Sequence, residues 1–256
     1  MYIHKTQNCN DPMILFLHAD GSDAQMWKKH FEAFTNYYCV APDFPGFGKS
    51  NGIRWTSIDQ VTDEVKDLIL RHPMKKAHVV GLSLGGSIAI NLLGKHSQYI
   101  DHAIIDGAGV LPIAGASLIK AGVAAVSPFI QNDLVINVMV KALGMESDKD
   151  IADFRLAMKS TDPYAFRTAF AQANNLAEPS GLEQISVPTL FVAGEKEAKE
   201  TVESGILLAK KMKKAACYIM PGLGHGWIGR APQVHVEMTR AWIEGSHLPA
   251  ELIQKV

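Results

Sequence analysis

The sequence predicts an α/β protein with a mostly parallel central sheet, helices on both faces and an inserted block of helices. Short apolar runs alternate with amphipathic stretches in residues 1–109 and again in 181–256, the rhythm of parallel strands joined by helices. Residues 110–180 keep helical patterns but lose the strands. We therefore expect a core domain made of residues 1–109 and 181–256, with a helical cap insertion at 110–180.

Composition is that of an ordinary globular chain. The 256 residues carry a net charge of −1, with 47% apolar and 20% charged residues, so neither nucleic acid nor a charged membrane surface is an expected partner. No apolar run reaches the roughly 18 residues of a membrane span, and the first residues lack a signal-peptide layout. The three cysteines have no metal-binding spacing. We expect a cytoplasmic protein that acts on a small molecule without a metal or organic cofactor.

The first elements follow from local patterns. Met13 to Leu17 is a continuous apolar run, as expected for a parallel strand buried on both faces. Tyr2 to Thr6 alternates weakly and fits a short edge strand. A helix is expected at residues 24–34 and a strand at 37–41. Ser57 and Gln60 have the spacing of a capping box, which predicts the start of the next helix. The strand before the central motif is expected at 77–80, and another at 102–106.

The insertion consists of helical patterns punctuated by prolines. The expected helices are Leu118 to Val126, Leu134 to Leu143, Ile151 to Lys159 and Tyr164 to Asn175. Ligands of open α/β sheets bind beyond the carboxyl ends of the strands. Helices inserted there would cover the site and give it an apolar lining. The alternative is a helical block that only thickens the core. After it we expect a strand at 188–194, a helix at 200–214, a strand at 217–220 and a closing helix at 232–243.

The segment Gly81-Leu82-Ser83-Leu84-Gly85 lies between an expected strand and an expected helix. A G-x-S-x-G pattern in that context is typical of a nucleophile elbow, in which the serine hydroxyl stands on a sharp turn in front of the sheet. The glycines leave room for a turn too tight for Cβ atoms. The helix that starts behind Ser83 favours developing negative charge. A glycine-rich turn with an ordinary serine is the alternative interpretation.

Four blocks together make the chain similar to the α/β-hydrolase family. They are His18 to Trp27, which resembles the family's His-Gly loop; Asp43 to Ser50, which resembles its Asp-x-Pro-Gly-x-Gly-x-Ser loop; the elbow at 81–85; and Leu223 to Trp227, which resembles the block around the catalytic histidine. They occur in the family's order, and the resemblance runs through nearly the whole chain outside the insertion. Only 12 residues precede the first buried strand, so we expect the family's first hairpin to be shortened.

The resemblance implies a Ser-acid-His triad. Ser83 is the expected nucleophile and His225 the expected base, because a serine hydroxyl needs a base beside it at neutral pH. Glu197 holds the position where the family commonly has an aspartate, in the loop after the strand at 188–194. Asp106, at a station used by a minority of the family, is the alternative acid, and Glu195 is a third. Glu197 as a merely solvated charge also stays open.

The resemblance also implies an oxyanion hole made of two backbone N–H groups. One belongs to Leu84, directly after the nucleophile, and the other to Asp20 in the His-Gly loop. Because a carboxylate beside an oxyanion is unfavourable, we expect the Asp20 side chain to point away, toward donors of its own loop. Ala19 replaces the family's usual glycine after His18, which predicts a loop less free to turn at that residue.

The leading hypothesis is a serine hydrolase that cleaves a small, fairly apolar carboxylic ester, lactone or thioester through an acyl-enzyme. A second enzyme hypothesis keeps the triad and changes the reaction to carbon–carbon bond hydrolysis or cofactor-free perhydrolysis. A hypothesis of a different class is a hydrolase-like receptor that captures a small ligand with little turnover. The sequence leaves the natural substrate and the oligomeric state open.

Overall fold

Eight strands form one sheet in the order β1-β3-β2-β4-β5-β6-β7-β8, in a computed structural model that describes all residues from 1 to 256. The strands are β1 (Tyr2–Lys5), β2 (Met13–Leu17), β3 (Tyr38–Asp43), β4 (Ala77–Leu82), β5 (Ile100–Asp106), β6 (Thr189–Gly194), β7 (Ala215–Met220) and β8 (Ile253–Gln254). The six central strands pair in parallel, and β1 and β8 pair antiparallel at the two edges. The predicted fold class is therefore confirmed.

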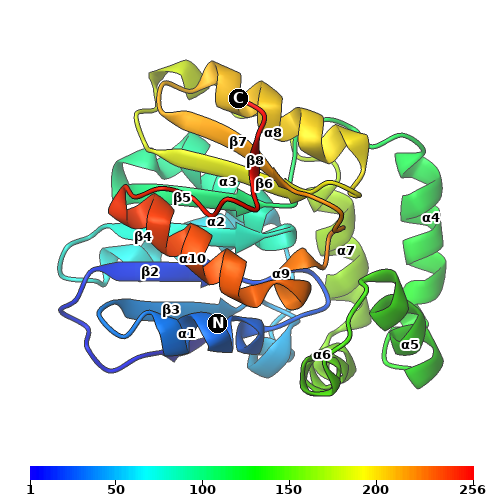
Figure 1. Cartoon of the computed structure of the whole chain (residues 1–256). Helices are drawn as coiled ribbons and strands as arrows, with labels where there is room; N and C mark the ends of the chain where they lie inside the picture. Colours follow the sequence, from blue (N-terminus) through cyan, green and yellow to red (C-terminus); the bar gives the residue numbers. More distant parts are fainter.

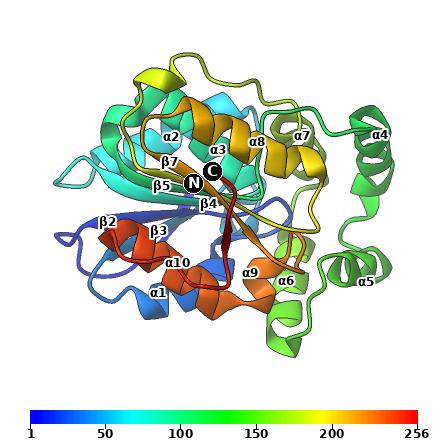
Figure 2. The same cartoon turned by 45° about the horizontal axis from the view of Figure 1, so that its top comes forward.

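Helices cover both faces of this sheet (Figure 2). On one face lie α2 (Ile58–Leu70), α3 (Leu84–His96) and α8 (Lys199–Lys211), and on the other lie α1 (Lys28–Ala33) and α10 (Pro232–Glu244). Because a parallel strand is buried on both sides, its alternate residues serve two cores. Leu15 of β2 belongs to a cluster of 33 buried residues on the first face, whereas Ile14 and Phe16 belong to a cluster of 17 on the second.

Four helices lie between β5 and β6, and residues 110–180 contain no strand. They are α4 (Ala116–Val126), α5 (Asp133–Ala142), α6 (Asp148–Ser160) and α7 (Pro163–Ala173). They stand beyond the arrowheads of the strands, at the end of the sheet where the elbow lies (Figure 1). We refer to α4–α7 as the inserted helices. None of the helices in the structure has the length and apolar content needed to cross a lipid bilayer.

Local expectations hold with small differences. β1 is the only strand before β2, which agrees with a shortened first hairpin. The Ser57 Oγ accepts a hydrogen bond from the Gln60 N–H at 3.1 Å, but the reciprocal bond of a capping box is missing, because the Gln60 side chain bonds to Thr56 and Glu64 instead. The predicted helix at 24–34 begins as a short 3₁₀ turn, η1 (Ala24–Trp27), before α1.

Candidate active site

Ser83 stands in a strained turn between β4 and α3. Its backbone has φ 56° and ψ −112°, and Ser83 is one of only two non-glycine residues with positive φ. The flanking glycines are required by close approach. A Cβ on Gly81 would lie 2.3 Å from the Gly85 carbonyl oxygen, and one on Gly85 would lie 2.1 Å from that of Leu17. The predicted tight turn is therefore present, and it places the serine at the N-terminus of a 13-residue helix.

His225 and Glu197 come from the loops that follow two neighbouring strands, β7 and β6. The His225 Nδ1 lies 2.7 Å from Glu197 Oε2, and the Gly194 N–H donates to Glu197 Oε1 at 2.9 Å. The Glu197 side chain is 3% exposed, so this carboxylate is held between an imidazole and a backbone amide. The structure thus pairs His225 with Glu197. Glu195 is exposed and accepts from the Gly222 N–H instead.

The electrostatic setting of His225 suits a base that becomes charged during a reaction. Burial by itself lowers the pKa of His225. The hydrogen bond and charge of Glu197, together with the charge of Asp106, raise the pKa by more than burial lowers it, so it lies above the usual value of 6.5. A carboxylate on Nδ1 also fixes the tautomer that leaves Nε2 free to accept a proton.

Ser83 and His225 line the same two cavities. The larger, of about 820 Å³, is also lined by Glu197 and by residues of the inserted helices such as Ile119 and Phe170. The smaller, of about 260 Å³, lies against the loop that contains Asp20. No hydrogen bond links the Ser83 hydroxyl to His225, as is common in unliganded sites. The structure therefore brings the two residues to one site, and their catalytic roles stay a prediction.

The two predicted oxyanion donors carry free N–H groups. Leu84 is the first residue of α3, where an N–H has no partner within the helix. The Asp20 N–H donates no backbone hydrogen bond. The left-handed turn of this loop is made at Gly21, with φ 69°, and Ala19 has no positive φ. The alanine in place of the family's glycine therefore brings no left-handed backbone strain at this residue.

The expectation for the Asp20 side chain is wrong in one respect. Neither carboxylate oxygen has a hydrogen-bond partner, so no loop donor satisfies it, although both oxygens are buried. Burial raises the pKa of Asp20 well above its usual value and outweighs the opposite influence of the nearby Gly21 N–H. The physical reason is crowding by the insertion, since Met158 and Phe166 pack against the adjoining Gly21.

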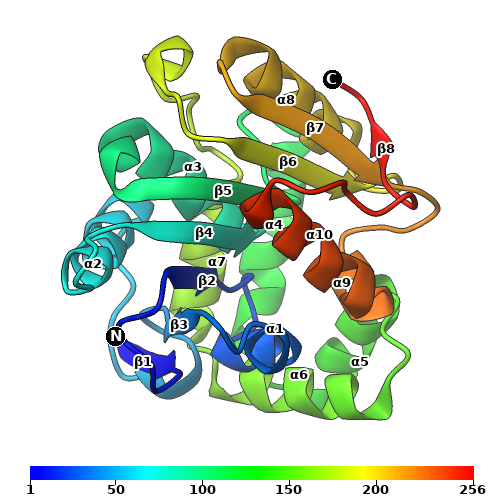
Figure 3. The same ribbon diagram turned by 60° about the vertical axis from the view of Figure 1, so that its left-hand side comes forward.

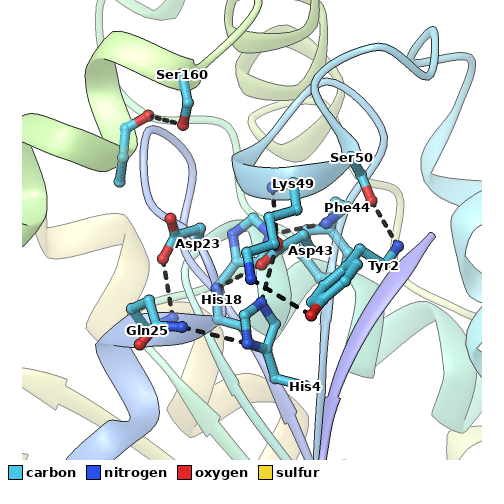
Figure 4. A network of polar contacts seen from close by, with 12 residues as sticks. Tyr2, His4, His18, Asp23, Gln25, Asp43, Phe44, Lys49, Ser50 and Ser160 are labelled. Atoms are coloured by element: carbon cyan, nitrogen blue, oxygen red, sulfur yellow. Dashed lines mark hydrogen bonds and ion pairs between the residues drawn. The ribbon is translucent and has the colours of Figure 1, made fainter.

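A buried carboxylate in β3 ties the His18 loop to its neighbours (Figure 4). Asp43, 1% exposed, accepts hydrogen bonds from the Ala24 and Lys49 N–H groups at 2.9 and 2.8 Å, and lies 3.1 Å from His4 Nε2. His18 Nε2 accepts from the Phe44 N–H at 3.0 Å. Burial lowers the pKa of His18 to about 4, which keeps it neutral. These contacts fix the loop that carries the Asp20 N–H.

Asp106, the alternative triad acid, is engaged elsewhere. Its Oδ1 accepts from the Trp227 indole N–H at 2.9 Å, and its Oδ2 lies 3.5 Å from His235 Nε2. His235 Nδ1 in turn lies 2.7 Å from His30 Nε2. All of these side chains are buried behind the site. This network could not be predicted, because its members are far apart in the chain and come together only when distant elements pack.

Gly107, which follows Asp106, was also missed. It has φ 59°, and a Cβ there would lie 2.8 Å from His225 Cε1 and 3.2 Å from Glu197 Oε2. The imidazole therefore packs directly on this backbone, which only a glycine allows. A glycine directly after a predicted strand was the available signal.

Comparison with known proteins identifies relatives that share this fold. A model of the alpha/beta hydrolase family matches residues 14–237. The chain is 29% identical to 3-oxoadipate enol-lactonase 1 of Acinetobacter baylyi over 204 residues, which cover 77% of this chain and 75% of the relative. Among solved structures it resembles MenH of S. aureus, with a TM-score of 0.79, 21% identity and 95% and 98% of the two chains covered. It also resembles the enol-lactonase of Burkholderia xenovorans LB400, with a TM-score of 0.77, 18% identity and 94% and 96% covered.

Proposed function

The chain belongs to the alpha/beta hydrolase family and is a hydrolase, and from this premise we propose that it cleaves a small ester or lactone through an acyl-enzyme formed on Ser83. The observation that carries the proposal is one arrangement: a serine on a strained elbow shares a cavity with a histidine whose other nitrogen is bonded to a buried carboxylate. That is the arrangement nucleophilic acyl transfer requires.

The first half of the reaction forms the acyl-enzyme. Ser83 Oγ attacks the carbonyl carbon while His225 Nε2 takes the hydroxyl proton. Glu197 holds the imidazole in place and stabilises its charged form. The negative oxygen of the tetrahedral intermediate receives hydrogen bonds from the Leu84 and Asp20 N–H groups. When the intermediate collapses, the bond to the alcohol oxygen breaks, and the imidazolium returns the proton to that oxygen.

The second half releases the acid. Water enters the position of the alcohol, His225 removes its proton, and the hydroxide equivalent attacks the acyl carbon. Collapse of the second intermediate breaks the bond to Ser83 Oγ, which takes back the proton. For a lactone the alcohol and the acid stay on one molecule, and the product is a hydroxy acid or its tautomer. A relative named as an enol-lactonase supports including lactones.

The decisive experiment is labelling with a fluorophosphonate probe, followed by mapping of the modified residue. We expect the label on Ser83, because only that hydroxyl stands on the elbow beside His225. Ser87, one helical turn further along α3, lines the same cavity and provides a matched control. Ser83→Ala should abolish both labelling and hydrolysis of p-nitrophenyl esters, and Ser87→Ala should keep both. An unlabelled protein, or an active Ser83→Ala variant, would refute the mechanism.

A further inference from the structure

The solvent-accessible charged side chains in the lining of the large cavity are cations. Among the side chains that line it, only Lys196, Glu197 and Arg230 are charged. Both oxygens of Glu197 are occupied, one by His225 and one by the Gly194 N–H, and its side chain is 3% exposed. The two cations therefore face the cavity without a competing free carboxylate in its lining.

Both cations are accessible. Lys196 is exposed and forms no ion pair, unlike Lys199 in the same segment, which pairs with Glu203 at 3.0 Å. Arg230, at the end of α9 (Trp227–Arg230), donates to the Gly144 carbonyl oxygen at 3.2 Å and pairs with Glu146 at 2.8 Å. Glu146 is 70% exposed, so this pair is largely screened by water. The guanidinium has five N–H groups, and these contacts orient it without using all of them.

Part of the remaining wall is apolar and comes from residues 110–113, Ile119 and Phe170. Uncharged polar side chains, among them Asn174, Asn175 and Thr201, also line the cavity. Such a wall favours an uncharged body for the ligand, and the cations favour a negative group at its end.

The small cavity, which Ser83 also lines, holds more acidic than basic side chains. Besides Asp20, whose carboxyl oxygens are buried, four acidic side chains and three lysines line it: Asp23, Glu32, Asp150 and Asp153 against Lys28, Lys29 and Lys149. Lys29 is already paired with Asp150 at 2.9 Å. An anionic group is therefore favoured on the large-cavity side of the catalytic residues and disfavoured on the other.

We propose that the substrate carries a terminal anionic group, a carboxylate or a phosphate, which binds toward Lys196 and Arg230 while the scissile carbonyl lies at Ser83. This inference rests on the proposed ester or lactone hydrolysis and names the class of substrate. It also refines the expectation of a fairly apolar substrate, which holds for the body of the molecule and not for its end.

The test compares charged and neutral members of matched substrate pairs at pH 8. One pair places the charge on the acyl side: the mono-p-nitrophenyl ester of glutaric acid and its N-methylamide. A second places it on the alcohol side: the butyrate ester of γ-hydroxybutyrate and that of its N-methylamide. A third member, with a phosphate in place of the carboxylate on the same alcohol, distinguishes the two anions. The readout is the ratio of kcat/KM for charged over neutral members.

We expect the ratio to exceed one in at least one pair and to fall by about 10-fold in the double variant Lys196→Gln/Arg230→Gln, as the loss of two partly exposed ion pairs would give. Higher ionic strength should lower it as well. Lys196→Arg/Arg230→Lys keeps both charges and should keep the ratio, which separates charge from folding. Lys149→Gln, a cation of the small cavity, should leave the ratio unchanged.

Two failures are distinguishable. If wild-type protein hydrolyses the charged and neutral members of both pairs equally, and Ser83→Ala removes turnover of all of them, the anionic substrate is refuted and the hydrolase mechanism stands. If Ser83→Ala keeps its turnover, the proposed function itself is refuted. A ratio that falls equally in Lys149→Gln would also contradict the assignment to Lys196 and Arg230.

Discussion

The sheet core buries many more apolar side chains than the inserted helices do. The core holds clusters of 33 and 17 buried residues, whereas the inserted helices form a cluster of only five. α4 has no buried residue, and Leu118 on it is 81% exposed. α7 is the exception, because Ala165 and Ala169 pack in the main core. The difference teaches that the proposed reacting groups extend from the densely packed part, while the loosely packed part contributes only some of the cavity wall, such as Ile119 and Phe170.

Among changes that keep the Ser83 hydroxyl, the largest effect should come from removing the charge that Glu197 places on His225. Glu197→Gln should lower kcat/KM by about 10²–10⁴-fold, since the tautomer and the imidazolium lose their support. His225 must be neutral to accept a proton and its pKa is raised, so wild-type kcat/KM should rise with pH through a midpoint above 6.5. In the variant that midpoint should move down. A pH profile of kcat/KM measures both effects.

Glu195→Gln provides the matched control for that experiment. Glu195 is an exposed carboxylate two residues away, bonded to the Gly222 N–H and not to His225. Its replacement should change neither the rate nor the midpoint. Equal losses in the two variants would mean that the loop, and not the Glu197 carboxylate, supports the reaction.

The contrast in packing can be measured directly with one pair of leucines. Leu15→Ala in β2, at a side chain 0% exposed, should lower the free energy of unfolding by about 2–5 kcal/mol. Leu118→Ala in α4, at a side chain 81% exposed, should change it by less than about 0.5 kcal/mol. Urea unfolding of both variants gives the comparison. Similar losses would show that α4 is buried in solution by something outside this chain.

Gly107→Ala tests whether activity depends on the position of the His225 imidazole and not only on the stability of the fold. The new Cβ would lie within 2.8 Å of the His225 ring, and displacement of the imidazole should lower kcat/KM by about 10²-fold. Gly115→Ala is the control, because Gly115 also has positive φ, at 72°, but a Cβ there meets nothing within 4 Å. Both variants carry the backbone strain of alanine in the left-handed region. A rate loss of the same size in both would refute the steric account.

The smallest effect expected is a gain in stability. The pKa of Asp20 is higher in the folded protein than in the unfolded chain, where it is near 3.8. At any pH above 3.8 the residue therefore lowers the free energy of unfolding, and this loss grows with pH until the pH exceeds the folded pKa. Asp20→Asn should therefore increase the free energy of unfolding by about 1–2 kcal/mol at pH 8. The difference should shrink as the pH is lowered toward 4. Urea unfolding across this range tests it, and a constant difference would contradict the titration.

Most of the architecture could be predicted because parallel strands buried on both faces are continuous apolar runs, as in residues 13–17. The pairing of His225 with Glu197 followed from the family's usual position for the acid, in the loop after the strand at 188–194. The strand β8 could not be predicted, because two exposed residues carry no pattern. Nor could the Asp106–His235–His30 contacts, which depend on how distant elements pack. The unsatisfied Asp20 carboxyl likewise depends on the seating of the inserted helices against its loop.

The ends of the sheet have a consequence for solubility. At one border β1 spans four residues and at the other β8 spans two, both running against their neighbours (Figure 3). Edge strands this short expose few unpaired backbone N–H and C=O groups with which a strand of another molecule can pair. Deleting β1 or β8 would make β3 or β7 the edge strand, each six residues long. The longer exposed edge could then pair with strands of other molecules and favour aggregation.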